Sequence, residues 1–251
     1  MRLEDRRVLV IGGGGGGIGR AMTRAFGSQG AAVAVADRDP DRAAEAVDEL
    51  RDAGATAVAL TVDVRDADGL AATIAAAVRE LGGLDTLVTV VGGQLEFVPT
   101  VKLHEMRDDD WDTVYELNLR YVARAVRLVL PVFLEQGHGS IVSVGSVTGV
   151  MAAPHQAAYG VAKAGLLSLA RTVAAEYSAD GIRMNVVVAG AIATPVNPGP
   201  DGWVEPIPLG RYGRSDEVAE AAVYLASDAA SYVTGQQLVI DGGVSARGPF
   251  G

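Results

Sequence analysis

The sequence contains no cysteine, which removes disulfide bonds, thiolate catalysis and cysteine-based metal sites from consideration. Histidine is nearly as scarce: His104, His138 and His155 share no metal-ligand spacing, so we expect no bound metal. Basic residues are outnumbered, with 21 Lys and Arg against 31 Asp and Glu and a formal net charge of −10. Since a nucleic-acid-binding protein carries a basic stripe and none is visible here, we expect no nucleic-acid partner.

Long apolar runs are missing as well. No uninterrupted apolar stretch is long enough to span a bilayer, and the charged N-terminus lacks the apolar segment of a signal peptide. We therefore expect no membrane partner and a cytoplasmic location. What the chain does have is a hydrophobic content of 49%, which provides enough apolar surface for a large core in 251 residues.

Short apolar runs alternate with helical patterns along the whole chain. Val8-Leu9-Val10-Ile11 is typical of a strand buried on both faces, and Pro40 sits where a helix begins. Strands separated by helices predict right-handed crossovers and one α/β domain over residues 1–251, a Rossmann-type, doubly wound parallel sheet of about seven strands with helices on both faces. The expected strands are 8–11, 32–36, 57–62, 86–91, 140–144, 182–188 and 237–240. The expected helices are about 18–29, 41–53, 67–81, 109–136, 156–179 and 215–227.

Two irregular stretches, residues 92–107 and 189–214, each follow a strand of the expected sheet. In a doubly wound sheet, ligands bind outside the carboxyl ends of the strands. Both stretches are therefore placed to border a site, and we expect a substrate loop at about residues 190–214.

A run of six glycines, from Gly12 to Gly17, joins the first strand to the first helix. Glycines allow a tight turn and a close approach of pyrophosphate, and the helix N-terminus offers free N–H groups. Such a run leaves the register of any G-x-G-x-x-G match ambiguous, and a flexible loop would match equally well. Its place between a strand and a helix, at the start of a βαβ unit, favours a dinucleotide site.

Asp37 ends the expected second strand, where a carboxylate can accept hydrogen bonds from the ribose hydroxyls and repel a 2′-phosphate. This favours NAD over NADP. Arg38 is the competing feature, because an arginine beside the ribose can pair with that phosphate, and Asp37 can also be a plain turn residue. Asp63 and Val64, at the end of the third strand, are candidates for contact with the adenine.

Tyr159 and Lys163 lie four residues apart in an expected helix and so share one face. A nearby ammonium favours the phenolate over the phenol, whose unperturbed pKa is about 10, and such a tyrosine can act as acid or base. The pair alone is common by chance. Here it is accompanied by Ser146 at the end of the fifth strand and by Asn118 in the long helix.

With these residues in place, the chain resembles the short-chain dehydrogenase/reductase family over nearly its whole length. Many ordered matches carry the resemblance, from the glycine loop to the C-terminal region. They are Gly13-x-x-x-Gly17-Ile18-Gly19, Asp63-Val64, Asn118, Ser146, Tyr159-x-x-x-Lys163, 182–185, 208–211, 217–219 and 241–243.

The resemblance implies an NAD-dependent oxidoreductase that interconverts a secondary alcohol and a ketone. Tyr159 would be the general acid/base, and Lys163 would bind the nicotinamide ribose and lower the tyrosine pKa. Ser146 would hold the substrate oxygen, Asn118 would hold a helix distortion and a water, and Thr194 would contact the nicotinamide amide. The expected dinucleotide-binding residues are Gly13, Gly17, Ile18, Gly19, Asp37, Arg38, Asp63, Val64, Gly92, Tyr159, Lys163, Ile192 and Thr194.

Three positions depart from the family's pattern. Gly12 replaces the usual threonine, Thr89-Val90-Val91-Gly92 replaces Asn-Asn-Ala-Gly, and Ala189 replaces a proline. Thr89 is the candidate to substitute for the bracing asparagine, and we expect the loop around the adenosine ribose to be rebuilt. None of these departures touches the four catalytic candidates.

The stretch from Pro195 to Pro206 is short for the family's substrate lid and carries four prolines, which stiffen a loop. We therefore expect an open site for a cyclic or otherwise bulky apolar alcohol or ketone. The resemblance also implies a homo-oligomer, a tetramer paired through the long helices. The competing function is a non-catalytic dinucleotide-binding regulator, which has no need of the four catalytic candidates. The expected substrate-lining residues are Gln94, Leu95, Ser146, His155, Tyr159, Ile192 and Trp203.

Overall fold

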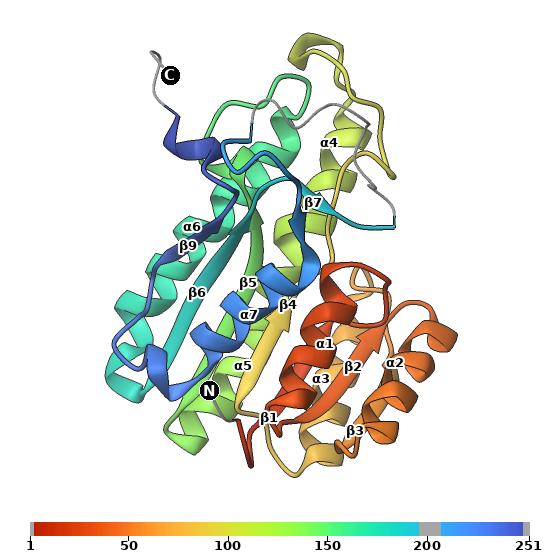
Figure 1. The fold of residues 1–251 in the computed structure, drawn as a ribbon, viewed down its shortest axis with the longest axis vertical. Helices are drawn as coiled ribbons and strands as arrows, with labels where there is room; N and C mark the ends of the chain where they lie inside the picture. Colours follow the sequence, from red (N-terminus) through yellow and green to blue (C-terminus); the bar gives the residue numbers. More distant parts are fainter. Residues whose placement is uncertain (1–2, 196–206, 248–251) are drawn as a thin grey trace.

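Seven parallel strands form the central sheet in a computed structural model of the chain, which describes residues 3–195 and 207–247 (Figure 1). The strands of this sheet are β1 (Arg7–Ile11), β2 (Ala32–Asp37), β3 (Ala57–Thr61), β4 (Thr86–Thr89), β5 (Gly139–Ser146), β6 (Ile182–Ala189) and β9 (Gln237–Ile240). The helices are α1 (Ile18–Ser28), α2 (Pro40–Asp52), α3 (Ala67–Leu81), α4 (Asp108–Tyr115), α5 (Tyr121–Gln136), α6 (Ala157–Tyr177) and α7 (Ser215–Ala226). The expected doubly wound, single-domain fold is confirmed.

Different helices cover the two faces of the sheet (Figure 1). In β1, Leu9 and Ile11 join the core beneath α3, α5 and α6, whereas Val8 and Val10 join the core beneath α1, α2 and α7. Successive side chains of a strand point to opposite faces, so a strand covered on both sides needs apolar residues at every position. This explains why β1 is an unbroken apolar run.

The strand order is β3-β2-β1-β4-β5-β6-β9, so successive strands are added on one side of β1 up to β3 and on the other side from β4 onward. β1 pairs in parallel with β2 on one side and with β4 on the other, so the following loops run outward in opposite directions. A crevice forms at such a switch point, outside the carboxyl ends of the strands. The glycine run after β1 and the segment after β4 both border this crevice.

The long helix predicted over residues 109–136 is interrupted. α4 ends at Tyr115, a π-helical turn covers Glu116–Arg120, and α5 follows. The side chain of Asn118 donates to the carbonyl oxygen of Val114 at 2.8 Å, inside this turn. The interruption is the local distortion that the resemblance implied for Asn118, and π turns often occur at functional sites.

Several element boundaries differ from the prediction by one or two residues, and two differences lie near the crevice. β4 ends at Thr89, two positions before the predicted end, and the stretch expected to be irregular contains a small two-stranded sheet of β7 (Ile192–Ala193) and β8 (Gly213–Arg214). In the part of the chain that the structure describes, no helix has the length and apolarity needed to cross a membrane.

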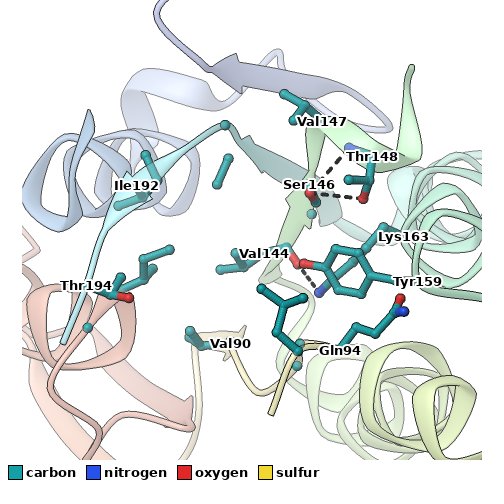
Figure 2. Close-up of a pocket in the computed structure, with 18 of the residues that line it drawn as sticks. Val90, Gln94, Val144, Ser146, Val147, Thr148, Tyr159, Lys163, Ile192 and Thr194 are labelled. Atoms are coloured by element: carbon teal, nitrogen blue, oxygen red, sulfur yellow. Dashed lines mark hydrogen bonds between the residues drawn. The ribbon is translucent and has the colours of Figure 1, made fainter. Parts of the chain in front are cut away.

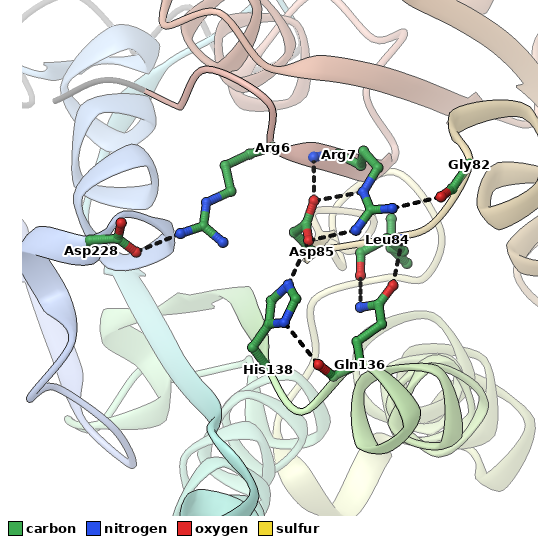
Figure 3. Close-up of polar contacts among 8 residues, drawn as sticks. All are labelled: Arg6, Arg7, Gly82, Leu84, Asp85, Gln136, His138 and Asp228. Carbon is green, nitrogen blue, oxygen red and sulfur yellow. Dashed lines mark hydrogen bonds and ion pairs between the residues drawn. The ribbon is translucent and has the colours of Figure 1, made fainter.

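The buried carboxylate of Asp85 links neighbouring strands at the end of the sheet that lies opposite the crevice (Figure 3). Arg7 donates to it from Nε at 2.8 Å, from Nη2 at 2.9 Å and from its backbone N–H at 2.8 Å. His138 Nε2 lies 2.8 Å from Asp85 Oδ1, the oxygen that also accepts from Arg7 Nη2, and Gln136 bonds both backbone groups of Leu84. β1, β4 and the start of β5 are thereby joined away from the crevice.

This network predicts an acid-sensitive component of stability. Burial raises the pKa of Asp85, but hydrogen bonds from Arg7 and His138 outweigh it and lower the pKa from 3.8 to about 2. Since the folded value lies below the unfolded one, the carboxylate stabilises the fold above pH 4 and loses this effect as the pH falls toward 2. Between about pH 5 and pH 3, we expect the free energy of unfolding to fall by about 1 kcal/mol more in the wild type than in Asp85→Asn. Urea denaturation at each pH measures this, and equal slopes in the two proteins would contradict it.

Candidate active site

A cavity of about 470 Å³ opens at the carboxyl ends of β4, β5 and β6 (Figure 2). Figure 2 shows Ser146, Tyr159 and Lys163 on one side of it and Ile192 and Thr194 on the other. The wall is completed by the glycine loop at Gly17, Ile18 and Gly19, by residues 92–96 after β4, and by residues 144–148 and 189–191.

Tyr159 lies in the first turn of α6, and Ser146, the last residue of β5, lines the cavity beside it. Burial raises the pKa of the Tyr159 phenol, and the Ser146 contact lowers it by less. The phenol is therefore neutral at physiological pH in this structure. Lys163 Nζ lies 5.5 Å from the centre of the tyrosine ring, so the lowering of the pKa that we predicted from Lys163 is not the dominant effect.

Lys163 is only 3% exposed, and its Nζ donates to the carbonyl oxygen of Val144 at 2.9 Å. Burial lowers the pKa of Lys163 to about 8, so the ammonium form still prevails at neutral pH. Space beside it is limited, because a Cβ on Gly92 would lie 3.0 Å from Nζ and 2.5 Å from Asn118 Oδ1. Glycine at position 92 thus allows the close approach of this segment to both side chains.

Asn118 is fully buried and hydrogen-bonds the backbone of the segment after β4 that contains Gly92 and Gly93. Its Nδ2 donates to the carbonyl oxygen of Gly93 at 2.9 Å, and its Oδ1 accepts from the Gly93 N–H at 2.9 Å. The π turn aims the amide at this backbone. Asn118 therefore positions the loop that faces Lys163.

A second cavity, of about 460 Å³, lies at the carboxyl ends of β2 and β3. Asp37 lines it, with Oδ2 accepting from the Gly14 N–H at 3.1 Å and Oδ1 accepting from the Asp39 N–H at 3.2 Å. Gly92 and Glu96 line both cavities, so the two are adjoining parts of one crevice.

The glycine loop fits the phosphates of an extended ligand along this crevice. A Cβ on Gly14 would lie 2.9 Å from the backbone of α2, and one on Gly17 would lie 3.2 Å from Thr194, so side chains at either position would fill the space. The first turn of α1 carries no acidic residue, and its free N–H groups suit an anion. The residues present therefore fit a dinucleotide.

The other predicted dinucleotide contacts fall into two groups. Arg38, Asp63 and Val64 line the second cavity; Arg65 pairs with Asp63 at 2.7 Å and lowers its pKa, as does the charge of Arg38 to a smaller extent. Gly13 lies behind the loop, buried, with its carbonyl oxygen accepting from Thr23 Oγ1 at 3.1 Å. Gly13 thus supports the loop from within the fold.

The predicted substrate-lining residues are only partly brought together. Gln94, Leu95 and Ile192 line the first cavity with Ser146 and Tyr159. His155 is exposed and is not among the lining residues; its carbonyl oxygen accepts from Gln94 Nε2 at 3.1 Å. Trp203 lies outside the described residues.

Sequence reasoning missed Thr148, Gln156 and Glu96, which also line the first cavity. Thr148 lies beside Ser146, whose Oγ accepts from the Thr148 N–H at 3.3 Å and from Thr148 Oγ1 at 3.1 Å. Gln156 directly precedes α6 with a non-helical backbone, so helical spacing from Tyr159 does not identify it. Nothing local marks Glu96. Among the described residues, no group of three or more His, Asp or Glu side chains could hold a metal ion.

Comparison with known proteins supports a dehydrogenase or reductase. Residues 13–245 match the family model described as enoyl-(acyl carrier protein) reductase. The chain is 35% identical to 3-oxoacyl-(acyl-carrier-protein) reductase FabG of Thermotoga maritima, covering 97% of this chain and 99% of that protein. It is 39% identical to cis-4-hydroxycyclohexanecarboxylate dehydrogenase of Sinomonas cyclohexanicum, covering 96% and 97%. The structure of a gluconate 5-dehydrogenase from Burkholderia cenocepacia, in complex with NADP and tartrate, superimposes with a TM-score of 0.91 at 31% identity, covering 98% of each chain.

Proposed function

The chain belongs to the short-chain dehydrogenase/reductase family, and from that premise we propose that it is an NAD-dependent oxidoreductase interconverting a secondary alcohol and a ketone. One observation carries the proposal: Tyr159, Ser146 and Lys163 surround a cavity that is continuous with a crevice suited to a dinucleotide.

This chain's own residues would hold the dinucleotide along the crevice. Asp37 would accept hydrogen bonds from the adenosine ribose hydroxyls, and the N–H groups at the start of α1 would bind the pyrophosphate. Lys163 and Tyr159 would bind the nicotinamide ribose, and Thr194 would contact the amide. When bound, the nicotinamide group supplies or accepts the hydride.

The protein moves the proton. In the reducing direction, Tyr159 donates its hydroxyl proton to the substrate oxygen, and burial keeps the phenol protonated and ready to donate. Ser146 donates a hydrogen bond to the same oxygen and stabilises the charge that develops there. The Lys163 ammonium, charged at neutral pH because its pKa is about 8, stabilises the phenolate that remains. Oxidation reverses these transfers.

The preference for NAD rests on the fixed position of Asp37. Two backbone N–H groups hold its carboxylate, so it cannot turn away from a 2′-phosphate without losing both bonds. The glycine loop carries no basic side chain, and Arg42 already pairs with Asp39 at 3.3 Å. Arg38 remains the side chain that could favour NADP. NADP is the dinucleotide bound in the structure of the gluconate 5-dehydrogenase from Burkholderia cenocepacia.

We infer that the substrate is uncharged and cyclic or otherwise bulky and apolar. Among the described lining residues, Lys163 is the single cation and is bonded to Val144, while Glu96 is the single carboxylate. The sequence of residues 195–206 adds no Lys, Arg or His. No group is thus available to pair with a substrate anion, although the Sinomonas relative is named for a carboxylate substrate.

A paired-substrate assay with both dinucleotides tests these statements. The substrates are cis-4-hydroxycyclohexanecarboxylate, its methyl ester and a short linear secondary alcohol. We expect kcat/KM to be at least about tenfold higher with NAD than with NADP, and at least about tenfold higher for the ester than for the acid. A preference for NADP would show that Arg38 outweighs Asp37, and a preference for the acid would contradict the uncharged substrate. Dinucleotide binding without turnover of a wider panel of alcohols and ketones would instead support the non-catalytic regulator.

A further inference from the structure

The segment after β4 lacks the family's asparagines, yet its backbone is held by a side chain from another element. Tyr121, the first residue of α5, is fully buried, and its hydroxyl donates to the carbonyl oxygen of Val91 at 2.8 Å. Val91 is half-buried, and this bond holds its peptide in place.

Two more buried hydroxyls support Tyr121. Thr89 Oγ1 donates to Ser143 Oγ at 2.8 Å, and the Thr89 side chain lowers the pKa of the Tyr121 phenol, against a larger rise due to burial. Thr89 is 2% exposed and Ser143 is fully buried. The three side chains come from β4, β5 and α5 and form a cluster of buried hydroxyls, of which that of Tyr121 bonds the Val91 carbonyl. We call Thr89, Tyr121 and Ser143 the hydroxyl brace.

Val91 in turn lies between the two loops that form the crevice. Gly12 has φ +90, and a Cβ there would lie 2.8 Å from Val91 Cγ2 and 3.0 Å from the Val91 backbone nitrogen. On its other side, Val91 is followed by Gly92, which faces Asn118 and Lys163. A shift of the Val91 peptide would therefore move both the start of the glycine loop and the wall opposite Lys163.

We propose that Tyr121 is a positioning residue for the dinucleotide site, with its hydroxyl, supported by Thr89, replacing the asparagine brace of the family. The proposal rests on the dinucleotide binding of the proposed function and adds a residue that has no direct contact with either cavity. It also links two departures from the family's pattern, Gly12 and the segment 89–92. Val91 occupies the space that a side chain at position 12 would need.

Binding of NAD to Tyr121→Phe, measured by calorimetry, tests the proposal. The substitution removes one hydroxyl and leaves the Val91 carbonyl without its partner. We expect the Kd for NAD to rise about tenfold, with a similar rise in KM and with kcat changed by no more than about twofold. Ser140→Ala is the matched control, because it also removes a buried hydroxyl that donates to a carbonyl, that of Leu225 at 3.3 Å, at the opposite end of β5.

Thermal denaturation separates positioning from a purely structural role. Both variants should lower Tm, but only Tyr121→Phe should weaken NAD binding. An unchanged Kd in folded Tyr121→Phe would overturn the proposal. Should that variant fail to fold, Thr89→Val gives the same test, with a smaller rise in Kd expected and an unchanged Kd again overturning the proposal. A wild type that binds neither NAD nor NADP would overturn the proposed function together with this inference.

Discussion

Tyr159→Phe is expected to lower kcat by a factor of about 10² to 10⁴, the usual contribution of a positioned general acid or base. The substitution removes only the hydroxyl, and the ring still packs beside Val98, Val114 and Ala158. Burial keeps the Tyr159 phenol neutral, so deleting its hydroxyl removes no charge from the site and leaves no neighbouring charge without a partner. We therefore expect Tm to stay near its wild-type value in thermal denaturation. The Kd for NAD, measured by calorimetry, should rise by no more than about tenfold, because one hydrogen bond to the nicotinamide ribose is lost.

Tyr232→Phe is the matched control, because it deletes the same hydroxyl from a fully exposed tyrosine outside both cavities. It should leave kcat unchanged. A Tyr159→Phe enzyme that keeps more than about a tenth of wild-type kcat would show that another group moves the proton.

The seven strands could be predicted because each is buried between helices, which forces an apolar pattern that is readable from the sequence. The π turn could not, because Glu116-Leu117-Asn118 carries no signal that distinguishes it from a regular helix. Only the resemblance implied a distortion at Asn118. The π turn is accompanied by a tertiary contact, the pair of bonds between Asn118 and Gly93, which lie 25 residues apart.

The candidate site divides in the same way. Asp37 and Ser146 end strands, and the carboxyl ends of parallel strands meet at one edge, so their convergence on the crevice was predictable. His155 was expected to face the substrate from its spacing of four residues before Tyr159. α6 begins only at Ala157, however, and His155 has φ 67, so helical spacing does not extend to it. The predicted homotetramer stays a prediction.

The pKa of Tyr159 was the least predictable feature. Sequence spacing identifies Lys163 as a neighbouring cation, but burial is set by the tertiary packing of β5 and α6 against the segment after β4. In this structure burial dominates both residues, raising the pKa of Tyr159 and lowering that of Lys163. Burying an ammonium has a cost in stability that is separate from its value for catalysis.

Lys163→Met is therefore expected to lose activity while gaining stability. The change in the pKa of Lys163 from 10.5 to about 8 corresponds to a cost of about 3 kcal/mol for burying the charge, and the bond to Val144 offsets part of it. At neutral pH we expect the free energy of unfolding to rise by about 1 kcal/mol, measured by urea denaturation. We expect kcat/KM to fall by a factor of about 10² or more, because the phenolate of Tyr159 loses its stabilising cation.

The pH dependence of this gain identifies its cause. Above the folded pKa of about 8, the buried amine of the wild type loses its proton, whereas the unfolded chain keeps it up to about 10.5. Wild-type stability should therefore rise by about 3 kcal/mol relative to Lys163→Met across this range, so that the gain of about 1 kcal/mol disappears and the wild type becomes the more stable protein. Lys102→Met, at an exposed lysine, should show neither the gain nor the pH dependence. The opposite result, a Lys163→Met protein less stable than the wild type at neutral pH, would show that Lys163 stabilises the fold. Its burial would then not lower stability in exchange for catalysis.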